Sequence, residues 1–438
     1  MGLVIASGTV VTPDGVDRQH QTIRINDSGK ISGIHRQEAT NKAGRDGIER
    51  LEAAGRIVLP GMVNSHAHSG MAVLRGVGDG LPLEPWLDAV RRIEGQMTRE
   101  DIFWSLQLAL CEMIRNGTTG FADMFLWDEA LIDSVIDSGM RLSAAPAIFG
   151  QNDIGWESAG GLRASEQIAH IERLAATYAE EPRVRIMYGP HAIYTCKESV
   201  FKAVAERVRE TGLGVHVHLS ESMHEVNACL KEYGLTPVQM AEQAGLLTDK
   251  TIVAHGTWLT DLDLEILAKR KSTVSHNPQS NLKLGSGIAP VTKMLAHGVR
   301  VSLGTDGPAS NDSLDMIRDM RLAVSLQRGV NQQSNALSPQ DCLEMATYNG
   351  SRALGFDDIK LEEGASADLI LVNAQGVRSL PLTSASGYIG WCATGHDVTD
   401  VVVNGRILMR NQELLTIDEE RVMYEILRIK DRLGLNVP

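Results

Sequence analysis

The chain of 438 residues is long enough for one large domain or for a barrel with an accessory domain. A hydrophobic fraction of 43% supports a sizeable core. The net charge of -13 argues against nucleic acid or an anionic membrane as the main partner, because both attract basic surfaces. No apolar run approaches the roughly 20 residues of a membrane span. The five scattered cysteines indicate reduced thiols and a cytoplasmic protein.

Both ends of the chain consist of short β-type runs separated by turn residues. Residues 22–25 near the start and 367–372 near the end are examples. Asn404 and Gly405 join two further apolar runs and predict the turn of a β-hairpin. We therefore predict one small β-sandwich domain built from residues 1–56 and 361–438.

Residues 57–360 alternate β-type runs with amphipathic helical stretches. The candidate strands lie at 57–66, 118–124, 141–149, 183–191, 214–221, 251–256, 272–277 and 299–306. The candidate helices include 99–116, 164–180, 197–212, 260–270 and 312–328. This α/β alternation predicts parallel strands, and a (β/α)8 TIM barrel is the leading arrangement. An open, doubly wound sheet is the structural alternative.

Histidines and one aspartate recur at the ends of the candidate strands. His66 and His68 are two residues apart, so on a strand both side chains face the same side. His216 and His218 repeat this spacing. The other strand ends carry His191, His255, His276 and Asp306. Because the carboxyl ends of barrel strands meet at one rim, the pattern predicts a metal site there.

Four segments resemble motifs of the amidohydrolase superfamily, and within it the methylthioadenosine/S-adenosylhomocysteine deaminase branch. They are residues 60–68, 218–221, 275–284 and 303–307. The resemblance implies one divalent metal bound by His66, His68, His218 and Asp306. This ligand set suits Zn²⁺, with Fe²⁺, Ni²⁺ or Mn²⁺ as alternatives. Binuclear relatives carry a lysine at the end of the fourth strand, and residues 183–191 contain none.

The resemblance also implies the reaction and its catalytic residues. Water activated by the metal would attack C6 of an adenine ring, with Asp306 and His255 accepting its proton. Glu221 would protonate the adjacent ring nitrogen. The predicted activity is hydrolytic deamination of adenosine, 5′-deoxyadenosine, methylthioadenosine or S-adenosylhomocysteine, which releases ammonia and the inosine product.

The same resemblance implies how the substrate is bound. Glu94 would hold the ribose hydroxyls, and His191 would contact the purine or ribose. Glu221 and Asp306 would face the ring that reacts. Trp86 would cover the pocket.

The 5′ group of the substrate is the part that the sequence predicts least directly. Relatives that accept homocysteine carry an arginine near the end of the third strand, and residues 142–147 contain none. Arg163 is the candidate replacement, after a loop at 149–163 that we expect to be specific to the substrate. Without a bidentate partner for a carboxylate, we expect neutral 5′ groups to bind better than an amino-acid tail.

Two other functions fit parts of the sequence. One is deamination of guanine, 8-oxoguanine or a pterin, or hydrolysis of a triazine, and Glu94 argues against it because a free base has no ribose. The other is a binding or assembly module without catalysis, against which the complete set of ligands and proton carriers argues. The expected partner is a small nucleoside or heterocycle, and the resemblance also allows a homo-oligomer.

Overall fold

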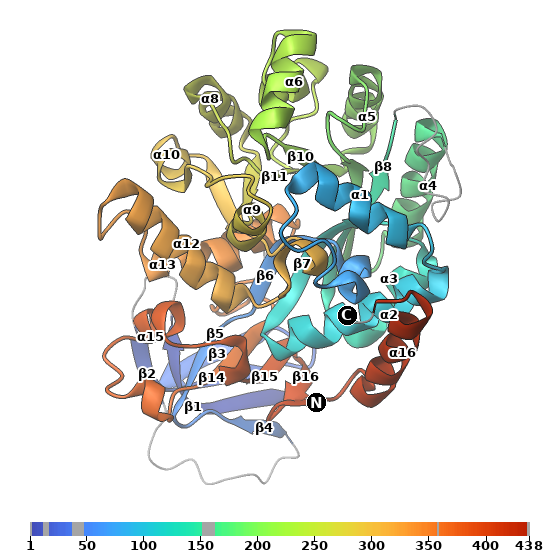
Figure 1. Ribbon diagram of the computed structural model, residues 1–438. Helices are drawn as coiled ribbons and strands as arrows, with labels where there is room; N and C mark the ends of the chain where they lie inside the picture. The colour runs from blue at the N-terminus through green and yellow to red at the C-terminus, as the bar shows by residue number, and fades with distance from the viewer. Residues whose placement is uncertain (1, 12–16, 37–47, 151–162, 357–358, 436–438) are drawn as a thin grey trace.

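The computed structural model describes residues 2–11, 17–36, 48–150, 163–356 and 359–435. Eight parallel strands form a barrel at its centre (Figure 1). In order around the barrel they are β6 (Met62–Ala67), β7 (Thr118–Phe125), β8 (Arg141–Ile148), β9 (Val184–Pro190), β10 (Gly214–Leu219), β11 (Thr251–His255), β12 (Thr273–His276) and β13 (Arg300–Leu303). The predicted barrel is confirmed, with the first predicted strand divided between β6 and a preceding strand.

Hydrogen bonds between the first and last strands close the barrel. The backbone amide of Asp306 donates to the carbonyl of His66 at 2.9 Å. The hydroxyl of Ser65 donates to the carbonyl of Leu303, also at 2.9 Å. The alternative of an open, doubly wound sheet is therefore wrong.

The helices mostly follow the barrel strands and cover the outside of the barrel, although some lie at its carboxyl-terminal end or beside the second sheet. In the described residues they are α1 (Leu83–Glu94), α2 (Arg99–Arg115), α3 (Glu129–Ser138), α4 (Ala164–Thr177), α5 (Glu198–Thr211), α6 (Met223–Tyr233), α7 (Pro237–Ala244), α8 (Asp261–Arg270), α9 (Pro278–Lys283), α10 (Val291–Ala296), α11 (Pro308–Asn311), α12 (Met316–Asn331), α13 (Pro339–Glu344), α14 (Gly350–Ala353), α15 (Ala385–Trp391) and α16 (Glu419–Arg432). The five helices predicted from the sequence correspond to α2, α4, α5, α8 and α12.

Local signals in the sequence set the ends of α2. The hydroxyl of Thr98 accepts a hydrogen bond from the amide of Asp101 at 3.2 Å, and the Asp101 carboxylate accepts one from the amide of Thr98 at 2.5 Å. This capping box satisfies two amides that the helix leaves unpaired. Gly117, with φ of 84°, follows the helix in a left-handed conformation that suits glycine.

The two ends of the chain together form a second, nine-stranded sheet. Its strands are β1 (Leu3–Val11), β2 (Asp17–Ile25), β3 (Ile31–Arg36), β4 (Glu49–Glu52), β5 (Arg56–Pro60), β14 (Leu369–Asn373), β15 (Val398–Val403), β16 (Arg406–Arg410) and β17 (Glu413–Leu414). Asn404 and Gly405 turn between β15 and β16 with φ of 48° and 76°, as a tight hairpin requires. The predicted small β domain from both chain ends, with this hairpin, is confirmed.

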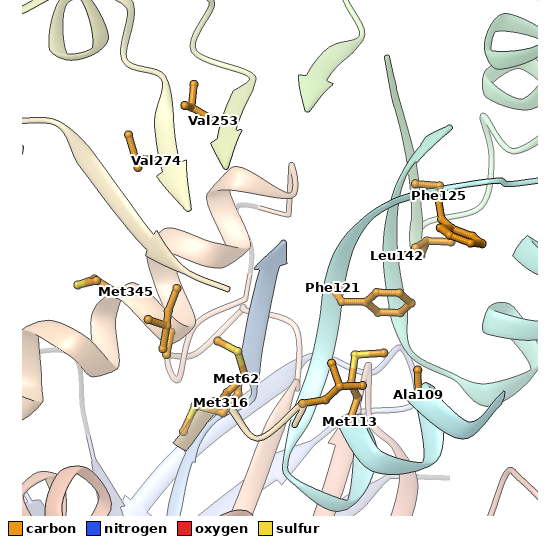
Figure 2. Packing of buried hydrophobic residues seen from close by; sticks show 14 of the residues in the cluster. Met62, Ala109, Met113, Phe121, Phe125, Leu142, Val253, Val274, Met316 and Met345 are labelled. Carbon is orange, nitrogen blue, oxygen red and sulfur yellow. The ribbon is translucent and has the colours of Figure 1, made fainter. Parts of the chain in front are cut away.

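Alternate residues of this sheet pack into two different cores. Leu369 and Leu371 of β14 pack within the small domain, whereas Ile370 and Val372 pack against the barrel. Figure 2 shows Met62, among others, in the packed layer on the barrel side. The division of the chain at residues 56 and 361 stays a prediction. We propose moving its first boundary to residue 61, because β5 pairs with β1 and β14.

A buried ion pair joins the small sheet to the amino-terminal end of the barrel. Arg141, at the start of β8, donates from Nε to Asp368 Oδ2 at 2.6 Å and from Nη2 to Oδ1 at 3.0 Å. Asp368 immediately precedes β14. The side chains of Arg141 and Asp368 are 4% and 0% exposed, so the pair is shielded from water.

The described structure also bears on the predictions from composition. All five cysteines lie in described segments, and they are unpaired. None of the described helices combines the length and the apolar character needed to cross a membrane.

Candidate metal centre and substrate cavity

Five side chains from the carboxyl ends of four barrel strands meet at one point. His66 and His68 come from β6, His218 from β10 and His255 from β11, and Asp306 follows β13. The ligand atoms of His66, His68 and His218 lie within 4.8 Å of one another, as do those of His66, His255 and Asp306. The structure thus brings together the four predicted ligands and places His255 beside them.

Hydrogen bonds behind the cluster fix which nitrogen of each ring faces inward. Nδ1 of His68 lies 2.5 Å from the Met124 carbonyl oxygen, and Nδ1 of His218 lies 2.8 Å from the His191 carbonyl oxygen. A carbonyl oxygen only accepts, so each Nδ1 carries a proton and Nε2 is the ring atom that can bind a metal. These two Nε2 atoms are 3.3 Å apart. This separation would allow both nitrogens to bind one metal ion.

His66 completes the inward-facing donors. Its Nδ1 lies 2.8 Å from Nε2 of His216, and its Nε2 is buried without a hydrogen-bond partner among the described residues. Oδ1 of Asp306 lies 3.3 Å from this Nε2 and 3.2 Å from Nε2 of His68. Three imidazole nitrogens around one carboxylate oxygen fit a divalent metal, and His216 supports His66 from behind.

Three residues at or just after these strand ends have unusual backbone angles. Ser220, His255 and Asp306 have φ of 56°, 72° and 64°. This left-handed conformation costs about 1–3 kcal/mol per residue and is concentrated at functional sites. Ser280 donates to Oδ2 of Asp306 at 2.6 Å and the amide of Gly307 to Oδ1 at 2.7 Å, so the carboxylate is held in one orientation.

Glu221 lies beside the cluster in the loop after β10. Its Oε2 is 3.6 Å from Nε2 of His255, and the Ser286 hydroxyl is 3.4 Å from its Oε1. Burial raises the pKa of Glu221 well above its usual value, and the carboxylates of Asp306 and Glu225 raise it further. This shift favours the protonated carboxyl group, which can act as a proton donor.

His255 is held as a neutral ring. Burial lowers its pKa to about 3, although the Asp306 carboxylate acts in the opposite direction. The side-chain amide nitrogens of Asn281 and Asn277 lie 3.0 Å and 3.3 Å from Nδ1. These contacts fix the ring, and its Nε2 faces Glu221.

The cluster lies in an open cavity at the carboxyl-terminal end of the barrel, the end at which barrels of this kind bind ligands. Most of its lining is apolar and aromatic, with polar groups gathered around the cluster. Glu94, His191 and Trp86 line the cavity together with Glu221 and Asp306. The fold thus brings five of the six predicted substrate contacts into one space.

Glu94, the last residue of α1, faces this cavity as a buried acid. It is 1% exposed, and neither carboxylate oxygen has a hydrogen-bond partner among the described residues. Burial raises its pKa to about 8, against the opposing effects of His68 and Arg91. A buried acid without a partner is costly to the folded protein, which favours a ligand as its partner.

His191 and Trp86 occupy different walls of the cavity. The ring centroid of His191 is 4.7 Å from that of His218, and its Nδ1 is 2.9 Å from the Thr195 hydroxyl. Burial holds the pKa of His191 well below its usual value, so the ring is neutral. The indole N–H of Trp86 donates to the Val77 carbonyl at 3.1 Å, so Trp86 offers the cavity its apolar surface.

Arg163 lies away from this cavity. It is exposed at the start of α4, where its backbone amide donates to Glu166 at 2.7 Å. It is not part of the cavity lining in the described residues, so its predicted contact with the substrate gains no support. Of the loop at 149–163 that we expected to be specific to the substrate, residues 151–162 lie outside the described residues.

Among the polar residues that line the cavity, the sequence analysis missed Arg91 and Tyr194. Arg91 lies three residues before Glu94 on α1, a spacing that places both on one face of the helix. The predicted role of Glu94 could therefore have pointed to Arg91. Tyr194 lies in the loop between β9 and α5, where no periodic signal marks it.

The model of the amidohydrolase family matches residues 57–408. The chain belongs to this family. Among curated proteins, a 5-methylthioadenosine/S-adenosylhomocysteine deaminase from Dictyoglomus thermophilum is 41% identical, over 86% of this chain and 87% of its own. A 5′-deoxyadenosine deaminase from Methanosarcina barkeri is 37% identical over 99% of both chains. The resemblance inferred from the four sequence motifs is confirmed.

Solved structures agree over nearly the whole fold. An adenosine deaminase from Xanthomonas campestris with bound zinc superimposes with a TM-score of 0.93 at 29% identity, over 99% of both chains. An atrazine chlorohydrolase from Arthrobacter aurescens complexed with zinc gives 0.87 at 26% identity, over 98% of this chain and 99% of the other. The barrel and the small sheet are therefore features of the family.

Proposed function

We propose that this amidohydrolase is a metal-dependent enzyme that deaminates adenine nucleosides by hydrolysing a C–N bond. The observation that carries this proposal is the placement of a buried acid, Glu221, beside the histidine cluster in the same cavity as Glu94. Deamination of a purine needs a proton donor for the ring nitrogen, and a nucleoside offers ribose hydroxyls to a carboxylate. The curated deaminases that are 37–41% identical act on nucleosides of this kind by name.

His66, His68, His218 and Asp306 would hold one divalent metal. We propose Zn²⁺, because three imidazoles and one carboxylate oxygen form a donor set that suits it. When bound, the metal would act as a Lewis acid that makes water nucleophilic at neutral pH. The inward-facing nitrogens of His66, His68 and His218 support this placement.

The residues around the cluster divide the proton transfers between them. Burial favours the protonated form of Glu221, which would give its proton to the ring nitrogen next to the carbon under attack. Asp306, fixed by Ser280, would accept a proton from the attacking water and pass it to the departing amine. His255 would orient the water through Nε2, because burial keeps its ring neutral.

The nucleoside part of the proposal depends on Glu94. At its position in the cavity wall, the ribose 2′- and 3′-hydroxyls would supply the hydrogen bonds that its two oxygens lack among the described residues. Guanine, 8-oxoguanine, a pterin or a triazine has no such hydroxyls and would leave the acid unpaired. Glu94 therefore favours a nucleoside over a free heterocycle.

The test is an ultraviolet assay of purified protein whose metal content has been measured. We expect adenosine and methylthioadenosine to be converted to their inosine products, with about one metal per chain. Guanine and a chlorotriazine serve as the contrasting substrates. Turnover of these two without turnover of any nucleoside, in fully metal-loaded protein, would leave a hydrolase but overturn the nucleoside assignment.

We also propose that the enzyme works in the cytoplasm on small molecules and not on nucleic acid. The five unpaired cysteines and the net charge of -13 support this proposal. Assembly into a homo-oligomer stays a prediction from the family resemblance.

A further inference from the structure

A second cavity opens between α1 and α6 and shares a wall with the substrate cavity. Leu83, Leu87, Arg91 and Tyr194 line both spaces. Figure 1 shows α1 lying across the barrel next to β10, the strand that leads into α6. The shared residues make this groove the continuation of the substrate cavity beyond Glu94.

The groove between α1 and α6 has an unusual pair of buried polar atoms. Nε of Arg91 and Oε1 of Glu225 are both buried without a hydrogen-bond partner among the described residues. The Glu225 side chain reaches the groove from α6, and this residue is 3% exposed. Its other oxygen, Oε2, accepts a hydrogen bond from the amide of Glu221 at 2.7 Å, so the carboxyl group is fixed in place.

The groove contains three further acidic residues. Glu84 and Asp88 of α1 and Glu232 of α6 also line it. At its exposed edge, Nε2 of His224 lies 3.6 Å from Oε1 of Glu84, a contact between the two helices. Among the described residues that line the groove, Arg91 is the only arginine or lysine and four residues carry carboxylates, so a ligand that suits both must carry both charges.

We propose that this groove binds the 5′ substituent of the nucleoside and that it suits a zwitterionic amino-acid tail. Arg91 is the residue that selects the carboxylate of this tail. The proposal rests on the proposed nucleoside deaminase function. With the ribose at Glu94, the 5′ carbon continues along the same face of α1 to Arg91, one helical turn away. The guanidinium would pair with the carboxylate, and Glu225 would accept hydrogen bonds from the ammonium.

This assignment reverses the expectation that neutral 5′ groups bind better. That expectation followed from the absence of an arginine in residues 142–147, at the end of the third barrel strand. The fold instead places an arginine from α1 in the cavity wall. Nε of Arg91 has no hydrogen-bond partner among the described residues, so it can donate to a substrate carboxylate without breaking an existing hydrogen bond.

The test compares substrates in the metal-loaded enzyme. The ratio of kcat/KM for S-adenosylhomocysteine to that for methylthioadenosine is measured in wild type, Arg91→Met and Arg92→Met. Arg92 is the matched control, because it is the next residue of α1 and is exposed. We expect Arg91→Met to lower the ratio about 10- to 100-fold, as for one charge-assisted hydrogen-bonded pair, and Arg92→Met to leave it within about two-fold.

A substrate analogue makes the test independent of how well the variant folds. A 5′-aminopropylthio adenosine keeps the ammonium and lacks the carboxylate, so wild type should turn it over about 10- to 100-fold less efficiently than S-adenosylhomocysteine. In Arg91→Met the two should become equal, because the interaction that separates them is gone.

Two results would overturn the proposal, and they differ from each other. If wild type deaminates methylthioadenosine but does not distinguish the analogue from S-adenosylhomocysteine, the assignment of Arg91 is wrong and the deaminase function stands. If fully metal-loaded wild type turns over no nucleoside, the deaminase function fails and the assignment falls with it.

Discussion

At the amino-terminal end of the barrel, the buried guanidinium of Arg141 donates two hydrogen bonds to the Asp368 carboxylate. At the carboxyl-terminal end, by contrast, the buried carboxyl group of Glu94 has no hydrogen-bond partner among the described residues. The same strands run through both ends. In barrels of this kind the carboxyl-terminal end carries function and the amino-terminal end carries stability. The contrast indicates that polar groups left without partners at one end are kept for a ligand, and that paired groups at the other support the fold.

The largest expected effect comes from removing the proposed proton donor, Glu221, at the carboxyl-terminal end of the barrel. Glu221→Gln keeps the size of the side chain but cannot protonate a ring nitrogen, so we expect kcat to fall about 10²- to 10⁴-fold. The ultraviolet assay measures kcat, and metal analysis should show unchanged metal content. Glu206→Gln, at an exposed position on α5, is the control and should retain full activity. An active Glu221→Gln enzyme would remove Glu221 from the proposed mechanism.

At the amino-terminal end of the barrel, we expect a substitution to lower the stability of the protein. Asp368→Asn leaves the Arg141 guanidinium buried without its counter-charge, so we expect the free energy of unfolding to fall by about 3–5 kcal/mol in urea titrations. The exposed pair of Arg410 and Glu49 is the control, and Glu49→Gln should change stability by less than about 1 kcal/mol. Equal effects of the two substitutions would contradict a special role for the buried pair.

The smallest expected effect is a gain in stability when Glu94 is replaced. Its pKa in the folded protein is about 8, above the ordinary value of 4.5, so rising pH ionises the unfolded chain first and destabilises wild type between these values. Glu94→Gln removes this penalty. We expect it to raise the free energy of unfolding by about 1–3 kcal/mol at pH 8 and by almost nothing at pH 4. A gain that does not depend on pH would show that burial of the acid is not its cause.

Much of the barrel could be predicted because its signals are local. The strand ends at His66, His218 and Asp306 follow apolar runs bounded by turn residues, and helices such as α2 carry their own caps. α1 was harder to predict from the sequence, since Pro85 interrupts its amphipathic pattern. The structure accommodates this proline in the first turn, where the missing amide costs no helical hydrogen bond.

The predicted role of Arg163 illustrates the limit of such signals. A position after a loop of uncertain length cannot be placed by counting residues, and the structure puts this side chain outside the cavity lining. The arginine that does line the cavity, Arg91, lies on a helix that precedes β7. The number of residues between two elements says little about which of their side chains meet.

The sequence by itself determined the donor types of the metal centre and the strands that carry them, because a two-residue spacing on a strand sets which side chains share a face. Only the tertiary structure decided that His216 supports His66 from behind, and that Arg91 and Glu225 line one groove. Both arrangements depend on how separate elements pack around the barrel, and packing is set by contacts between residues far apart in the chain.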